Sequence, residues 1–289
     1  MRTRAISAIG VVVVGLIPTL LGGWAFALLM IALGVIGYDE VRKIAGNLTP
    51  TPRIPVCGYV LIALWGVAAM LGVGTPAMVG LLFLTVAIAA LEQFPHAEHD
   101  GLLTGWAFAV AGSLYLGVPV FAAVALRNAS GTTLSSGFTT FADRVGVFGP
   151  GTAIGLGWVL LVMLSTWIGD SGAYLVGRSL GRHKLAPVLS PKKTIEGSIG
   201  GLVGTVLVAI AVDAVAGLGI GWVAVVLLGV VIGAAGQIGD LTESLMKRQA
   251  GVKDSGALIP GHGGILDRID ALLFAFPVGM VAAWLLGVL

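Results

Sequence analysis

The sequence predicts an all-α fold, a polytopic transmembrane helical bundle with about nine spans. Of 289 residues, 57% are hydrophobic and only 10% are charged, whereas soluble domains are about 25% charged. A soluble fold of this size could not bury so much apolar surface, because roughly half of any folded surface still faces water. The 45 glycines favour the same interpretation, since small residues let helices pack closely in lipid. The net charge of +2 is too small to indicate nucleic acid as a partner.

Apolar runs long enough to cross a bilayer follow one another along the chain. A helix needs about 20 apolar residues, within a range of about 17–25, to span the hydrocarbon core. The first run, 5–38, is too long for the apolar core of a signal peptide, which is about 7–15 residues. Pro18, Gly22 and Gly23 divide this run into a helical hairpin. The expected spans are 5–20, 23–38, 55–73, 76–92, 102–126, 152–176, 198–217, 220–240 and 264–288.

The basic residues between these spans indicate the orientation. With a cytoplasmic N-terminus, 13 lysines and arginines fall on the cytoplasmic side, and only Arg127 and Arg144 fall on the other. This asymmetry follows the positive-inside rule. We therefore expect an integral protein of the cytoplasmic (inner or plasma) membrane. The outer segment 127–150, rich in Ser, Thr and Gly, is expected to be a solvated connector.

Charge is concentrated in the second half of the chain. We expect N-terminal transmembrane helices over 1–150, and a catalytic transmembrane portion over 151–289 with cytoplasmic loops at 177–197 and 241–263. Two windows, 170–197 and 240–270, hold 16 of the 30 charged residues. The positive-inside rule explains their basic residues but not their acids, and charge in or near a membrane indicates function. These acids are Asp170, Glu196, Asp240, Glu243, Asp254, Asp267 and Asp270.

The first window ends in a segment suited to phosphate binding. Ser190, Lys192, Lys193 and Thr194 lie in a proline-containing stretch, expected to be a loop, that leads into the next span. Thr194 is a candidate N-cap residue. Backbone amides and the helix dipole favour anions at a helix start, and lysines add compact positive charge. The alternative is that the lysines only contact anionic lipid headgroups.

The second window begins with a polar helical stripe. If the eighth expected span continues as a helix, Gln237, Asp240, Ser244 and Lys247 recur at the spacing of one helix face, with Arg248 beside them. A polar stripe on an apolar helix is expected to face a cavity rather than lipid. The alternative is hydrogen bonding between helices.

Two more acids lie at the start of the last span. Asp267 and Asp270 are three residues apart and share a helix face. Together with Asp240 they would form an all-oxygen site that suits Mg²⁺, which uses one or two carboxylates plus substrate phosphates. The alternative for Asp270 is a simple complement to the helix dipole. Glycines such as Gly263 would let the backbone approach a ligand closely.

The run from Ser244 to Asp270 resembles the signature of the phosphatidate cytidylyltransferases, also called CDP-diacylglycerol synthases. Asp170 and the segments 190–197 and 236–240 are also similar to that family, so the resemblance covers about 152–289. The outer segment 127–150 is longer than we expect for the family. The matching signature positions are Ser244, Lys247, Arg248, Lys253, Asp254, His262, Gly263, Gly264, Asp267, Arg268 and Asp270.

The resemblance implies that CTP and phosphatidate react to give CDP-diacylglycerol and pyrophosphate for phospholipid biosynthesis. It implies Mg²⁺ held by Asp240 and Asp267, a second cation such as K⁺ nearby, a homodimer, and an active site facing the cytoplasm. The residues expected to be catalytic are Asp240, Asp267, Lys193 and Asp270. The residues expected to bind substrate are Asp170, Ser190, Lys192, Lys193, Thr194, Glu196, Ser244, Lys247, Arg248, Lys253, Asp254, His262, Gly263, Gly264 and Arg268.

Three other functions stay open at this point. A CTP-dependent polyprenol or phytol kinase needs the same nucleotide and metal but produces a lipid phosphate and CDP. An ion-coupled transporter would use intramembrane acids, although the first five spans carry almost no charge. A non-catalytic lipid-binding scaffold gives no reason for the acids between 254 and 270.

Overall fold

The computed structural model describes residues 13–48, 51–98, 100–131, 133–146, 152–258 and 263–289. About 76% of it is helical, which confirms an all-α membrane protein. Within the described ranges, seven helical segments are long and apolar enough to cross a membrane. They are α2 (Gly23–Ala45), α4 (Thr75–Leu91) with the short η1 (Phe94–His96), α5 (Leu102–Arg127), α7 (Ala153–Leu180), α8 (Ile195–Ala216), α9 (Trp222–Gln249) and α10 (Leu266–Leu285).

Two of the nine expected spans differ from the others. The third is α3 (Cys57–Met70), whose 14 residues are fewer than the roughly 17 that a perpendicular span requires. The predicted range 55–73 is therefore too long. In the first expected span, 5–20, residues 13–20 are helical and residues 5–12 lie outside the described residues.

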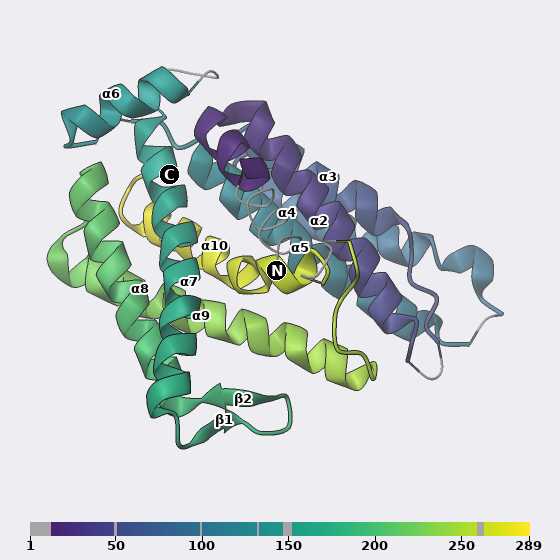
Figure 1. Cartoon of the computed structure of the whole chain (residues 1–289). Coiled ribbons are helices and arrows are strands. Elements are labelled where there is room, and N and C mark those ends of the chain that lie inside the picture. Colours follow the sequence, from purple (N-terminus) through teal and green to yellow (C-terminus); the bar gives the residue numbers. More distant parts are fainter. Residues whose placement is uncertain (1–12, 49–50, 99, 132, 147–151, 259–262) are drawn as a thin grey trace.

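The outer segment is more than a solvated connector, so that prediction is wrong in part. It contains the helix α6 (Ser136–Val145), which lies at the top of Figure 1. Ser135 begins this helix by accepting a hydrogen bond from the backbone N–H of Phe138 at 3.3 Å. Phe138 and Ala142 pack in one apolar cluster with Leu156 of α7. An amphipathic helix thus covers the start of α7.

Arg127 is not a solvated outer charge either. Its side chain is only 1% exposed. It donates to the backbone carbonyls of Thr19 at 2.7 Å and Leu20 at 2.9 Å. Arg127 therefore holds the end of the first helix against the end of α5, where a cation is favourable because helix carbonyls are otherwise unpaired.

A β-hairpin joins α7 to α8, and it corrects the loop predicted for 190–194. Strand β1 (Lys184–Ala186) pairs antiparallel with β2 (Ser190–Thr194), at the bottom of Figure 1. Their backbone groups bond to each other, which satisfies main chain that a loop would leave to water. Glu196 closes the base by accepting from the backbone N–H of Arg182 at 3.0 Å. The predicted N-cap is confirmed, since Thr194 Oγ1 accepts from the N–H of Gly197 at 3.1 Å.

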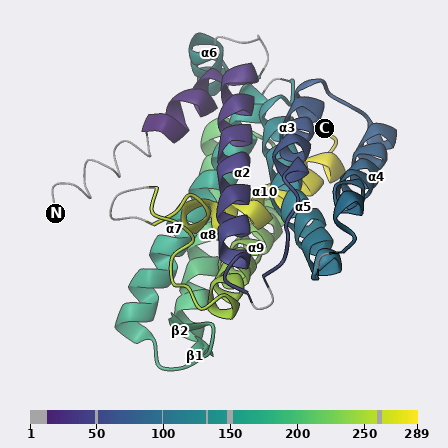
Figure 2. The ribbon, with the colours of Figure 1, turned by 90° about the vertical axis from the view of Figure 1, so that its right-hand side faces the viewer.

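The helices do not run parallel throughout. In Figure 1, α7 stands nearly upright while α9 and α10 run across it, and Figure 2 shows α2 and α3 as neighbouring helices. Buried aromatic residues, including Trp65, Phe121, Trp158 and Phe276, fill the apolar core between these layers. α9 extends to Gln249, so the predicted loop 241–263 begins nine residues too early. This extension contains Ser244 and Lys247 of the polar stripe, and both side chains are buried.

Candidate active site

A polar cavity of about 520 Å³ lies where α7, the hairpin, α8, α9 and α10 meet. Four of the seven acids in the two charged windows line it together: Asp170, Asp240, Asp267 and Asp270. Basic side chains line the same space: Arg178, Lys192 and Lys193. The fold therefore brings both windows to one cavity, as the sequence predicts. Arg178 is a residue that the sequence analysis did not single out; its only signal is its position in the first window.

Lys193 and Asp240 face each other across this cavity. The Lys193 Nζ lies 2.5 Å from Asp240 Oδ2, and both side chains are partly exposed, at 26% and 34%. Strand β2 supplies the lysine and α9 supplies the acid. Ser244, one turn along α9, lies 3.4 Å from Asp240 Oδ1. The pair links a positive strand to a negative helix face, and its exposure leaves it accessible to a ligand.

Asp267 is held through both of its oxygens. Oδ1 lies 2.5 Å from the Nζ of Lys247. Oδ2 accepts from the backbone N–H groups of Ser255 and Gly264, each at 2.9 Å. Lys247 is buried and also contacts Glu243 Oε2 at 2.7 Å. The Asp267 carboxylate is therefore fixed in position before any ligand arrives.

A residue from the N-terminal half supports this arrangement, and the sequence analysis missed it. Glu40 of α2 is 4% exposed. Its Oε1 accepts from the N–H of Ile265 at 2.9 Å, and its Oε2 accepts from the N–H of Leu266 at 2.8 Å. A Cβ on Gly264 would lie 2.5 Å from both Glu40 oxygens, so a glycine is required there. The only sequence signal was an acid at the end of an apolar run.

Gln237 of the polar stripe fits both interpretations, a helix-to-helix hydrogen bond and a cavity wall. Its Nε2 donates to the backbone carbonyl of Ser198 at 3.0 Å, and its Oε1 accepts from the Ser198 hydroxyl. These bonds join α9 to α8. Both residues also line the polar cavity. Hydrogen bonding between helices and a polar cavity wall are therefore both present.

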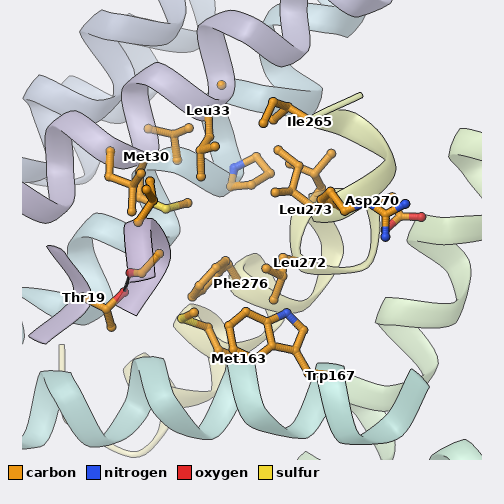
Figure 3. A pocket seen from close by; sticks show the side chains of 18 of the residues that line it. Thr19, Met30, Leu33, Met163, Trp167, Ile265, Asp270, Leu272, Leu273 and Phe276 are labelled. Carbon is orange, nitrogen blue, oxygen red and sulfur yellow. Dashed lines mark hydrogen bonds between the residues drawn. The ribbon is translucent and has the colours of Figure 1, made fainter. Parts of the chain in front are cut away.

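A second, apolar cavity of about 610 Å³ adjoins the first. Figure 3 shows it lined by apolar side chains from α2, α7 and α10, together with Thr19 and, at its edge, Asp270. Asp170, Asp267 and Asp270 line both cavities. A ligand with a charged head and an apolar tail could thus occupy the two together. The apolar lining includes Met30, Leu33, Met163, Trp167, Leu272, Leu273 and Phe276.

Several predicted site residues lie beside the cavities and not on their walls. Arg248 is exposed and donates to the Leu189 carbonyl at 3.3 Å, which ties α9 to the hairpin. Lys253 and Asp254 are exposed in the segment after α9.

Other predicted site residues do line a cavity: Thr194 lines the polar cavity and Arg268 lines the apolar cavity. His262 lies outside the described residues. Nine predicted site residues line neither of these two cavities: Ser190, Glu196, Ser244, Lys247, Arg248, Lys253, Asp254, Gly263 and Gly264.

Comparison with known proteins shows which sequences this chain resembles. A curated phosphatidate cytidylyltransferase of Staphylococcus epidermidis is 47% identical over 124 residues, covering 43% of this chain and 48% of the relative. The relative of that name from Staphylococcus aureus is 49% identical over 127 residues, with the same coverage of 43% and 48%. The chain thus spans about half the length of the curated relatives it matches. The model of a family described as the cytidylyltransferase family matches residues 2–286, so this chain belongs to the cytidylyltransferase family.

Proposed function

We propose that this protein transfers CMP from CTP to phosphatidate, giving CDP-diacylglycerol and pyrophosphate. The proposal rests mainly on one observation: an apolar cavity and a polar cavity adjoin, and three carboxylates line both of them at their border. These are Asp170, Asp267 and Asp270. The reaction needs such a border, because one substrate has acyl chains and the other is a highly charged nucleotide. Volumes of about 610 and 520 Å³ lie within the roughly 300–1,000 Å³ of small-molecule sites. The names of the relatives point to the same reaction.

The chemistry is a nucleotidyl transfer between two anions. A phosphate oxygen of phosphatidate would attack the α-phosphorus of CTP and form a new P–O bond. The bond from the α-phosphorus to the oxygen that bridges to the β-phosphorus would break, and pyrophosphate would leave with that electron pair. The attacking phosphate is already anionic, so a strong general base is not required. The main task is to offset the repulsion of the two reactants, for which Arg178, Lys192 and Lys193 line the polar cavity.

The acids fit the Mg²⁺ that the family resemblance implies. Within the described part of the chain, no three or more His, Cys, Asp or Glu side chains group tightly enough to hold a metal alone. Mg²⁺ commonly uses only one or two carboxylates and takes its other ligands from water and substrate phosphates. Asp240 and Asp267 would supply those carboxylates, with Asp170 or Asp270 orienting them. Bound Mg²⁺ neutralises developing phosphate charge, and K⁺ is the second cation we propose nearby.

Orientation and assembly complete the proposal. CTP is a cytoplasmic nucleotide, so we place the polar cavity on the cytoplasmic side of the cytoplasmic membrane, with the N-terminus on that side. Thirteen lysines and arginines fall on that side, and this supports the orientation because basic residues favour cytoplasmic loops. We also propose a homodimer, as the family resemblance implies. Phosphatidate would come from the surrounding membrane lipid.

The test uses the purified full chain in detergent with phosphatidate, Mg²⁺ and CTP labelled at the α-phosphorus. We expect the label to become soluble in organic solvent, and we expect none to do so when the γ-phosphorus carries it. Transfer of the γ-label would identify a lipid kinase and refute the proposal. Chelation of divalent ions should stop the reaction, and added Mg²⁺ should restore it.

A further inference from the structure

We infer that Glu40, which lines neither of the two cavities, is a positioning residue that sets the cation affinity of Asp267. The inference rests on the proposed function for the identity of Asp267 as a metal ligand. It assigns a role at the site to α2, which lies outside the two charged windows 170–197 and 240–270. The link runs from Glu40 through Ser255 to Asp267.

The first step of the link is the start of α10. Glu40 binds the N–H groups of Ile265 and Leu266 with separate carboxylate oxygens, at 2.9 and 2.8 Å. Charge-assisted hydrogen bonds of this kind are stronger than neutral ones, and a helix start favours a negative charge. Because Asp267 directly follows these two residues, Glu40 fixes the backbone from which that side chain projects.

The second step is Ser255. Its buried hydroxyl lies 2.9 Å from Glu40 Oε2 and also 2.9 Å from Asp267 Oδ2. A hydroxyl has one proton to donate, so two carboxylates share it. When a cation occupies Asp267, the proton can serve Glu40 alone. Ser255 therefore couples the two carboxylates, and the coupling favours a cation at Asp267.

A glutamate elsewhere in the molecule provides a matched control. Glu92 accepts from the backbone N–H groups of Val56 and Cys57, each at 2.8 Å, at the start of α3. It makes the same kind of cap as Glu40. Glu92 lines neither cavity and lies at a different helix start, so its loss reports the effect of uncapping a helix alone.

The experiment is a titration of the purified full chain with Mn²⁺, followed by the EPR signal of the free ion, without CTP or lipid. In Glu40→Gln an amide NH₂ replaces one acceptor oxygen and would face a backbone N–H. Loss of a group that orients a metal ligand typically lowers metal affinity about 10–100-fold, and we expect about tenfold here. Glu92→Gln should leave the affinity within about twofold of wild type, since distant sites act independently. Thermal unfolding of both variants is recorded alongside.

Three results would overturn the inference: no Mn²⁺ binding by the wild type, equal affinity in Glu40→Gln and wild type, or an equal loss in Glu92→Gln. Should Glu40→Gln not fold, Ser255→Ala decides, because it removes the shared hydroxyl and leaves the α10 cap in place. We expect weaker Mn²⁺ binding in Ser255→Ala, and unchanged binding would contradict the link. The titration needs no turnover, so Glu40-dependent Mn²⁺ binding in a protein that fails the CTP assay would refute the proposed reaction and leave this inference standing.

Discussion

Two buried charges each hold a helix of the N-terminal part against another helix, and they do so in different ways. Arg127 bonds the carbonyls of Thr19 and Leu20, and its partners in this network are backbone oxygens. Glu40 also caps a helix end, but it shares the Ser255 hydroxyl with a second carboxylate, Asp267. A charge satisfied by backbone alone contributes to stability. A charge that shares a proton with a cavity residue can also affect what that cavity binds.

The largest effect is expected at the two acids of the proposed metal site, one of which, Asp267, is linked to Glu40 through Ser255. Asp267→Asn and Asp240→Asn remove a negative charge from the proposed metal site. Metal stabilisation of a transition state contributes several kcal/mol, so kcat should fall by roughly 10²- to 10³-fold. The CTP assay measures this, and Asp213→Asn is a control because Asp213 bonds the backbone of Ile220 instead. Near-wild-type rates in either variant would refute the metal assignment. Glu40 would then have no metal ligand to position and would not differ in role from Arg127.

The next effect concerns the cation that faces Asp240. Lys193→Ala removes an ammonium group that lines the polar cavity. A hydrogen bond to a charged group contributes about 1.5–3 kcal/mol, so kcat/KM for CTP or phosphatidate should fall roughly 10- to 100-fold. Lys43→Ala is the matched control, because Lys43 pairs with Asp39 at 2.6 Å on the surface and is 70% exposed. An unchanged kcat/KM would exclude Lys193 from the site.

Arg127→Met should separate stability from function. The carbonyls of Thr19 and Leu20 would lose a charged donor, at a cost of about 1–3 kcal/mol for each buried group left unpaired. We expect a lower thermal unfolding temperature, and unchanged Mn²⁺ affinity and KM values in the protein that stays folded. In Glu40→Gln, by contrast, we expect the Mn²⁺ affinity to fall. A lower Mn²⁺ affinity in Arg127→Met would contradict the proposed difference between Arg127, which only stabilises the fold, and Glu40, which also affects cation binding.

The smallest effect is expected in the apolar cavity. Leu33→Trp adds bulk to its wall, which should raise the KM for phosphatidate several-fold and leave the KM for CTP unchanged. Leu28→Trp adds the same bulk on the same helix at a side chain that is 60% exposed. Kinetics with each substrate varied in turn measure both values. Equal effects of the two variants would place the lipid elsewhere.

The charged windows were predictable because charge is rare in this chain. Asp170, Asp240 and Asp267 stand out against an apolar background, and helix spacing then indicates which side chains share a face. The Thr194 cap was predictable for a similar reason, since it depends only on neighbours in sequence. Local rules therefore identified the charged residues that line the polar cavity, except Arg178, and the helix start next to it.

The remaining features depend on partners that are distant in sequence. Glu40 bonds a backbone group 225 residues away, and no local pattern distinguishes it from an interfacial acid such as Asp39. The hairpin was missed because Ser190–Thr194 contains a proline and becomes a strand only by pairing with Lys184–Ala186. The extension of α9 was missed because its last turns are polar, which sequence rules assign to a loop.

The border of acids between the two cavities has a consequence for the order in which products depart. Under the proposed reaction, CDP-diacylglycerol fills both compartments at once, whereas pyrophosphate occupies the polar one alone. Pyrophosphate can therefore diffuse away while the acyl chains remain bound in the apolar cavity. A new CTP can bind only after the CDP headgroup of the lipid product has left the polar cavity. Accumulated lipid product would then inhibit competitively against either reactant, which links turnover to the rate at which the bilayer removes what the enzyme makes.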